Sequence, residues 1–314
     1  MYDRRLTLVE STAHGIWVPA AAGSKRGLVY IPSKPHPEDD QIWFKTAEDG
    51  VKGAPPRGNN TLTWYYSYQS LPSTSLATLK SGSNGGLEFV PMLWGDYDNT
   101  FVADVRKLKS QGYIIKYVLG FNEPDMSSEF GGSNITPQKA AERWKKDIQP
   151  LKADGIFLGA PAPAGTEEGK AWMNQFFNAC TGCTIDFIPL HWYGDFQGLA
   201  SHLGHYTYMY PNMTFWITEL AFAHQDIGST EDMFKTTMEY LDKLSYVEKY
   251  SWFGSFRSDV SNVGPNAAFL TAQGQLTDIG SWYLGGSGSG IQPASSEAWK
   301  VDWVGKACID NLGE

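Results

Sequence analysis

The sequence predicts an α/β protein in which eight parallel strands alternate with helical or loop segments and close into a (β/α)8 barrel. The first observation is a repeat of short runs rich in β-branched and aromatic residues, spaced by about one strand-plus-helix unit. The second is the length of 314 residues, which one large barrel domain accommodates. The runs are 26–31, 62–68, 87–94, 117–121, 156–160, 185–192, 213–220 and 250–254.

The segments between the runs contain three clear helical patterns. Thr136 is a typical N-cap and Pro137 suits a first helical turn, so one helix is predicted to begin there. Its apolar face would contain Ala140, Trp144, Ile148 and Leu151. Ser229 predicts the start of a second helix, and apolar positions within 102–108 predict a third that ends at Gly112.

The repeat also sets the domain boundaries. We expect a single domain over 1–314, with the barrel at about 25–284, an N-terminal lead at 1–24 and a tail at 285–314. Both extensions would pack on the barrel, and in the tail Trp299, Trp303 and Ala307 share a helical face suited to this. Residues 32–60 are rich in Pro and Gly and show no clean helix, so the first unit is irregular.

Composition narrows the class of partner. A net charge of −9 and a pI near 5.2 argue against nucleic acid and anionic membrane surfaces. Charged residues make up only 19% of the chain, which is compatible with a neutral ligand. Aromatic residues make up 14%, enough both to fill a core and to provide flat platforms for sugar rings.

Cysteine is scarce, which excludes a disulfide-rich scaffold. Cys180 and Cys183 form the only close pair. A C-x-x-C pair can be redox-active or half of a zinc site, but no second pair or His-x-x-x-His follows and the surroundings are not thioredoxin-like. We expect a local disulfide, which would favour an oxidising compartment and leave Cys308 over.

Other features are compatible with secretion. Asn59, Asn134 and Asn212 each begin an N-x-T sequon. Residues 1–25 lack a signal peptide and no run is long enough to span a membrane, so a secreted form would have lost its leader. Nothing in the sequence indicates an oligomer, and we expect an extracellular monomer.

Two glutamates stand out because each follows an apolar run. Glu123 follows the fourth run in Gly-Phe-Asn-Glu-Pro, and Glu219 ends the seventh in Trp-Ile-Thr-Glu-Leu. Pro124 cannot continue a strand, so Asn122 and Glu123 can both reach a cleft although they are neighbours. A lone strand-end Glu is usually a solvated loop residue, but two on different strands favour a catalytic pair at the C-terminal face of a barrel.

The two motifs resemble the catalytic pair of glycoside hydrolase clan A, whose (β/α)8 barrels carry the acid/base after an Asn on the fourth strand and the nucleophile on the seventh. Four further segments are similar to glycoside hydrolase family 128, which consists mainly of β-1,3-glucanases: 25–30, 89–94, 182–187 and 191–193. The resemblance covers about 25–282. The long segment 32–60 departs from the family's shorter first unit, so the family does not imply the shape of that end of the cleft.

The resemblance implies a retaining hydrolase that cleaves β-1,3-glucan and needs no metal or cofactor. Glu123 would be the acid/base, Glu219 the nucleophile, and Asn122 a partner for the 2-hydroxyl of the reacting sugar. An endo-β-1,3-glucanase is the first expectation. An exo-acting enzyme, a glucanosyltransferase or a weakly active β-glucan-binding protein of the cell wall are the alternatives.

Aromatic and histidine side chains near the predicted strand ends are candidate substrate contacts: Tyr66, Trp94, His191, Trp192, Tyr193 and Trp252. Trp94 and Trp252 are expected to stack on glucose, whose apolar C–H faces suit aromatic rings. His191 and Tyr193 could orient the nucleophile by hydrogen bonding. Each ring could instead pack in the core, and for Tyr66 the two interpretations are equally supported.

Overall fold

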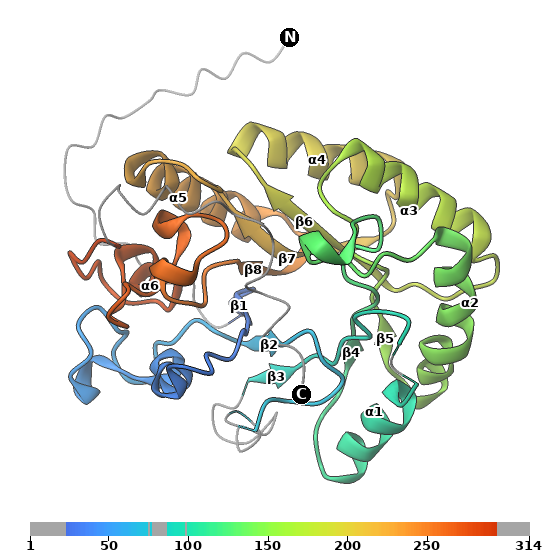
Figure 1. Ribbon diagram of the computed structural model, residues 1–314, viewed down its shortest axis with the longest axis horizontal. Helices are drawn as coiled ribbons and strands as arrows, with labels where there is room; N and C mark the ends of the chain where they lie inside the picture. Colours follow the sequence, from blue (N-terminus) through green and yellow to red (C-terminus); the bar gives the residue numbers. More distant parts are fainter. Residues whose placement is uncertain (1–22, 75, 77–86, 98, 294–314) are drawn as a thin grey trace.

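The computed structural model describes residues 23–74, 76, 87–97 and 99–293, and in them parallel strands gather at the centre with helices outside (Figure 1). Each of the predicted runs overlaps one strand. The strands are β1 Gly27–Val29, β2 Trp64–Tyr66, β3 Glu88–Phe89, β4 Tyr117–Val118, β5 Phe157–Leu158, β6 Phe187–Tyr193, β7 Thr214–Ala221 and β8 Val247–Trp252. The expected α/β class is therefore confirmed.

The strands pair in sequence order. β1, β2 and β3 form one parallel sheet, β4 and β5 a second, and β6, β7 and β8 a third. Isolated parallel bridges lie between the sheets: Met92 with Leu119, Gly159 with Phe187, and Arg26 with Tyr250. Sequential neighbours are therefore adjacent all the way from β1 to β8, and β8 is adjacent to β1.

Helices follow the strands from β3 onward. They are α1 Phe101–Ser110, α2 Pro137–Asp147, α3 Glu167–Ala179, α4 Phe196–Met209, α5 Ile227–Lys243 and α6 Asp278–Tyr283. Short 3₁₀ turns occupy η1 Pro37–Phe44, η2 Ala47–Asp49, η3 Ser128–Phe130, η4 Gln149–Asp154, η5 Ser258–Val260 and η6 Pro265–Ala267. The first strand is thus followed by 3₁₀ turns and no α-helix, and the expected irregularity of the first unit is confirmed.

Two of the predicted helix ends are correct and one is wrong. The Thr136 hydroxyl accepts a hydrogen bond from the Lys139 N–H at 3.3 Å, so α2 begins where its N-cap predicts. α1 is followed by Gly112 at a φ of 90°, a left-handed conformation that suits glycine. α5 begins before Ser229, because the Asp226 carboxylate accepts the Ser229 N–H at 2.9 Å and is the N-cap.

An aromatic cluster packs near the N-terminal ends of the strands. The ring of Trp216 on β7 lies 4.2 Å from that of Phe187, 4.9 Å from that of Tyr117 and 5.2 Å from that of Trp64, measured between centroids. The Glu248 carboxylate accepts hydrogen bonds from the Tyr117 hydroxyl at 2.7 Å and the Trp216 indole at 3.1 Å. This cluster joins residues of all three sheets and fixes the strands on the side opposite the cavity described below.

Two cross-links hold segments outside the strands. Cys180 and Cys183 form a disulfide at the end of α3, as predicted, with Cα atoms 5.4 Å apart. Arg257 binds both carboxylate oxygens of Asp39, at 2.7 and 2.8 Å, and ties η1 to the segment after β8. Such a bidentate pair fixes orientation as well as distance.

Several expectations concern residues outside those described: the lead up to residue 22, the helical face of Trp299, Trp303 and Ala307, and Cys308. Across residues 23–293, less the short gaps, no helix is long and apolar enough to cross a bilayer.

The first prediction concerns Trp216, which is fully buried. Trp216→Ala should lower the free energy of unfolding by about 3–5 kcal/mol, because it removes a large core ring and leaves Glu248 short of a donor. Chemical denaturation measures this. Tyr208→Ala on α4, where the ring is 84% exposed, is the control and should change stability by less than about 0.5 kcal/mol. Equal effects of the two changes would contradict the role of the cluster.

Candidate active site

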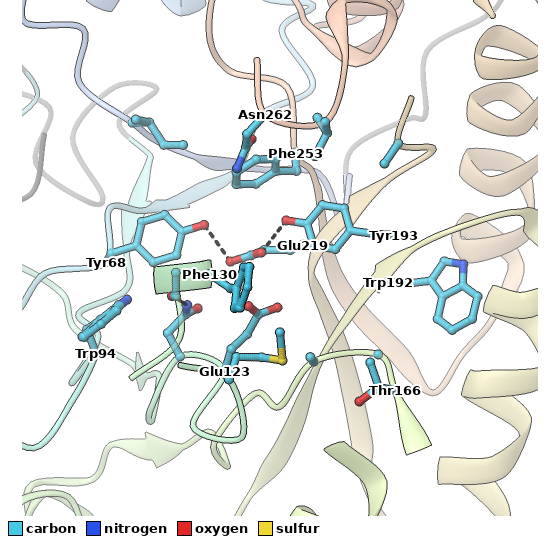
Figure 2. A pocket seen from close by; sticks show the side chains of 18 residues that line it. Tyr68, Trp94, Glu123, Phe130, Thr166, Trp192, Tyr193, Glu219, Phe253 and Asn262 are labelled. Carbon is cyan, nitrogen blue, oxygen red and sulfur yellow. Dashed lines mark hydrogen bonds between the residues drawn. The ribbon is translucent and has the colours of Figure 1, made fainter. Parts of the chain in front are cut away.

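A cavity of about 410 Å³ opens at the C-terminal ends of the strands (Figure 2). The end of each strand or the loop after it contributes to the lining. In strand order the contributors include Ile31, Tyr68, Trp94, Glu123, Ala164, Tyr193, Glu219 and Phe253. Residues from eight separate strand ends therefore converge on one volume, which includes both glutamates.

The Glu219 carboxylate is held by tyrosines on both sides. Its Oε1 accepts a hydrogen bond from the Tyr68 hydroxyl at 2.6 Å, and its Oε2 accepts one from the Tyr193 hydroxyl at 2.5 Å (Figure 2). Burial, reinforced by the charge of Glu219, raises the pKa of both tyrosines well above 10. Both hydroxyls therefore stay protonated and act as donors that fix the Glu219 carboxylate.

Asn122 and Glu123 reach the cavity together because the backbone turns at Glu123. Glu123 has a φ of 37°, in the left-handed region that non-glycine residues rarely occupy. The turn is held by hydrogen bonds from the Glu123 N–H to the Ala162 carbonyl at 2.8 Å and from the Asn122 N–H to the Trp94 carbonyl at 3.0 Å. Both side chains consequently line the cavity, although alternation along a regular strand would point them apart.

His191 lies between the two carboxylates. Its Nδ1 is 2.9 Å from Oε1 of Glu123 and 3.3 Å from Oε2 of Glu219, and its side chain is fully buried. One oxygen of each glutamate and a ring nitrogen of His191 all lie within 4.8 Å of one another. The imidazole therefore bridges the pair, and the carboxylates are close enough to act on the same bond.

The buried site shifts the pKa values of Glu123 and His191 away from their ordinary values. Burial, reinforced by the charges of Glu219 and Asp125, raises the pKa of Glu123 against the hydrogen bond from His191, which lowers it. Burial alone would lower the pKa of His191, but the charges of Glu219 and Glu123 outweigh it and raise that pKa. A glutamic acid that keeps its proton to higher pH is suited to donate it.

The same three side chains satisfy the chemistry of a cation site only in part. Carboxylate oxygens and an imidazole nitrogen are common ligands for divalent transition metals. The Nδ1 atom of His191, however, is shared with both carboxylates, and Glu219 already accepts two tyrosine hydrogen bonds. A metal ion would have to displace these donors, so the cluster fits a hydrogen-bonded acid–base pair better.

The structure brings most of the predicted side chains to the cavity. Asn122, Glu123, Glu219, Trp94, Trp192 and Tyr193 line it. His191 lies beneath it and contacts both glutamates. The Asn122 amide donates to the Gly131 carbonyl at 3.1 Å, and its Oδ1 is buried without a hydrogen-bond partner among the described residues.

Two predicted contacts lie elsewhere. Trp252 is fully buried, packs against Phe234 of α5 and donates its indole hydrogen to the Ala267 carbonyl, so it is not available as a sugar platform. Tyr66 is also fully buried, and its hydroxyl donates to the Thr218 carbonyl at 3.1 Å and lies 3.5 Å from Glu219 Oε1. Tyr66 thus fixes the backbone of β7 next to Glu219 by hydrogen bonding to Thr218.

Several lining residues were missed from the sequence: Tyr68, Phe130, Phe253 and Asn262. Tyr68 follows Tyr66 by two residues, and this spacing could have indicated that both face the same side. Phe253 follows Trp252, so the alternation in that run was assigned one residue off. Phe130 and Asn262 lie on loops where no periodicity applies.

A comparison of the sequence with known protein families identifies the class of protein. Residues 44–283 match the family model described as "Glycosyl hydrolase catalytic core". The match covers well over half of the chain, which therefore belongs to this class of glycosyl hydrolases. Solved structures with the same fold are members of glycoside hydrolase family 128, and the chain is a member of that family.

Two of these solved structures illustrate the range of the family. A curdlan-specific exo-β-1,3-glucanase from Blastomyces gilchristii, in complex with glucose, is 27% identical with a TM-score of 0.63 and covers 83% of this chain and 98% of its own. An endo-β-1,3-glucanase from Pseudomonas viridiflava is 26% identical with a TM-score of 0.63 and covers 87% and 99%. Oligosaccharide-binding proteins from Trichoderma gamsii and Cryptococcus neoformans, at 22% and 24% identity, share the fold.

One curated relative is a longer protein. The alkali-sensitive linkage protein 1 of Schizosaccharomyces pombe is 27% identical over 274 residues, which are 84% of this chain and 45% of that protein. The chain therefore spans less than half the length of this relative.

The second prediction concerns the proton on Glu123. His191→Gln removes the imidazole whose hydrogen bond and electrostatic effect lower the pKa of Glu123, so the pKa of Glu123 should rise further. Titration of the glutamate side-chain carboxyl carbons by NMR measures this shift. His36→Gln, which removes a histidine that pairs with Glu38, is the control and should leave Glu123 unchanged. A fall in the pKa of Glu123 in His191→Gln would contradict this electrostatic account.

Proposed function

We propose that the chain is a retaining glycoside hydrolase that cleaves within β-1,3-glucan, with Glu123 as acid/base and Glu219 as nucleophile. The observation that carries the proposal is the closeness of the two carboxylates, since one oxygen of Glu123 and one of Glu219 lie within 4.8 Å of each other. Retaining enzymes place their carboxyl groups about 5–5.5 Å apart, whereas inverting enzymes leave about 6.5–9.5 Å for a water molecule. The close pair therefore supports a double displacement.

In the first displacement, an oxygen of Glu219 attacks the anomeric carbon while Glu123 gives its proton to the departing glycosidic oxygen. The raised pKa of Glu123 keeps that proton in place at higher pH. In the second displacement, the deprotonated Glu123 takes a proton from water, and this water releases the sugar from Glu219. Tyr68 and Tyr193 donate to Glu219 throughout and hold its carboxylate in line.

Asn122 is suited to the 2-hydroxyl of the reacting sugar. One of its two amide hydrogens goes to the Gly131 carbonyl, which fixes the amide plane. The second hydrogen and the unpartnered Oδ1 remain for a ligand. A contact to the 2-hydroxyl strengthens as positive charge develops at the anomeric carbon.

The proposed architecture is one closed (β/α)8 barrel that forms a single domain over 1–314. The parallel bridges between the three sheets, including the one between Arg26 and Tyr250, support closure. The convergence of all eight strand ends on one cavity supports it as well.

The proposed substrate class and cellular location rest on the family, on the residues that line the cavity and on the disulfide. The family includes β-1,3-glucanases, and the aromatic, uncharged parts of the cavity wall suit a neutral glucan. The disulfide supports an oxidising, extracellular setting. We further propose that the chain acts as a monomer, without metal, cofactor, nucleic acid or membrane.

A glucan-binding protein with little or no turnover is the second candidate, because oligosaccharide-binding members share this fold. The intact pair of carboxylates and the raised pKa of Glu123 favour hydrolysis over binding alone. An exo-acting hydrolase and a glucanosyltransferase would use the same pair and differ in their products.

The third prediction tests activity and roles together. The chain should convert laminarin, a β-1,3-glucan, to mixed oligosaccharides, resolved by chromatography. Glucose alone would indicate exo action, longer chains would indicate transfer, and no products would indicate a binding protein. Glu219→Gln should lose activity entirely, and normal hydrolysis by this variant would refute the assignment.

The variant Glu123→Ala is the matched comparison. It should lose about 10²–10⁴-fold on laminarin but recover on an aryl glycoside whose leaving group needs no proton. Glu219→Gln should fail on both substrates.

A further inference from the structure

We infer that Asp125 is a positioning residue for the acid/base: its carboxylate fixes the backbone turn that presents Glu123 and places a negative charge near Glu123 and His191. The inference deepens the proposed function and rests on it for the role of Glu123. The effect of Asp125 on Glu123 is nevertheless measurable without turnover.

The Asp125 carboxylate continues the hydrogen bonds between the loops after β4 and β5. The Ala162 N–H donates to the Phe121 carbonyl at 2.9 Å, and the Glu123 N–H donates to the Ala162 carbonyl at 2.8 Å. Beyond them, the Ala164 N–H donates to Oδ1 of Asp125 at 3.0 Å. A side-chain oxygen thus takes the place of a backbone carbonyl where the regular pairing ends.

This bond supports the backbone turn at Glu123. The φ of 37° at Glu123 is unfavourable for a residue with a side chain, so the surrounding contacts must hold it. The next residue, Pro124, has no N–H with which to bond the loop after β5. The Asp125 side chain supplies a contact to that loop, so the turn is tied to it both at Glu123 and two residues further on.

The loop that Asp125 binds also packs on His191. A methyl group on Gly165 would lie 2.6 Å from the His191 carbonyl oxygen. A methyl group on Gly169, in the first turn of α3, would lie 3.2 Å from Oδ2 of Asp125. The carboxylate is therefore enclosed by the loop after β5 and the start of α3, and the same loop touches the strand that carries His191.

The second oxygen of Asp125 is placed at a cost to stability. Oδ2 is buried and has no hydrogen-bond partner among the described residues, and the same holds for Nε2 of His191. The titratable groups that interact electrostatically with Asp125 are Glu123 in its own loop, His191 on β6, Glu168 on α3 and Tyr206 on α4. A buried charge that no hydrogen bond satisfies acts strongly on its neighbours.

The charge of Asp125 acts on Glu123 and on His191. Burial is the largest cause of the raised pKa of Glu123, and the charges of Glu219 and Asp125 raise it further. Burial lowers the pKa of His191, but the charges of Glu219, Glu123 and Asp125 raise it. Loss of the Asp125 charge should therefore lower the pKa of Glu123, so that Glu123 loses the proton it must donate at a lower pH.

The variant Asp125→Asn separates the charge from the hydrogen bond. Asparagine keeps an oxygen for the Ala164 N–H but carries no charge, so titration of the carboxyl carbons by NMR should show a lower pKa for Glu123. The basic limb of kcat/KM on laminarin should move to lower pH in parallel, while kcat at the new optimum stays near that of wild type. Asp125→Ala removes the hydrogen bond as well and should lower kcat about 10²-fold, because the acid is no longer held in line.

Asp186→Asn is the matched control. Asp186 also accepts a backbone N–H from the β5 segment, that of Leu158 at 2.8 Å, but it lies just before β6 at the opposite end of the strands. This change should leave the titration of Glu123 and the pH profile as in wild type.

A pKa of Glu123 in Asp125→Asn that equals or exceeds that of wild type would overturn the inference, and so would full activity in Asp125→Ala. An equal shift in Asp186→Asn would also overturn it, because the effect would then not depend on where the charge lies. If Asp125→Ala does not fold, the titration of Asp125→Asn decides. A wild-type chain that does not hydrolyse laminarin would overturn the proposed activity, and the titration of Glu123 would still decide the effect of Asp125.

Discussion

The whole site depends on holding two carboxylates close together in a buried place. Glu123 and Glu219 come from strands β4 and β7, and their like charges oppose this approach. The structure resolves the conflict by placing His191 between them, with Nδ1 at 2.9 and 3.3 Å, and by directing the Tyr68 and Tyr193 hydroxyls at Glu219. The donors fix the Glu219 carboxylate, and burial raises the pKa of Glu123.

The strand order makes this arrangement possible. Parallel strands that pair in sequence order bring all their C-terminal ends to one side, so short loops suffice to supply donors from β2 and β6 to a carboxylate on β7. At the other end of the strands, the rings around Trp216 hold the three sheets together. The molecule thus separates a packed end, which gives stability, from a polar end, where chemistry takes place.

The polar end has features that do not favour stability. Glu123 adopts a left-handed backbone, and Asn122 Oδ1 and His191 Nε2 are buried without hydrogen-bond partners among the described residues. Each costs on the order of 1–3 kcal/mol, and such costs concentrate where a ligand is to be bound. The same backbone turn that is unfavourable at Glu123 brings Asn122 and Glu123 to one cavity.

The sequence was sufficient to predict the strands, the helices α1, α2 and α5, and the two glutamates at strand ends, because these follow from periodicity and from the family motifs. It was insufficient where side-chain direction depends on local backbone. Tyr68 lies past the end of β2, where its φ is 60°, and its side chain lines the cavity. The sequence pattern indicated Tyr66 as the substrate contact, but Tyr66 is fully buried within β2. Trp252 and Phe253 are neighbours, so alternation along the strand directs only one of the two rings toward the cavity. The register between β7 and β8 is irregular, and it decides which ring this is.

The most direct test of the account is the configuration of the newly formed reducing end. Proton NMR of a laminarin digest during its first minutes distinguishes the two anomers before they equilibrate. A double displacement through Glu219 predicts that the β-anomer appears first. First appearance of the α-anomer would show inversion, for which carboxyl groups typically stand about 6.5–9.5 Å apart, and would contradict the central claim.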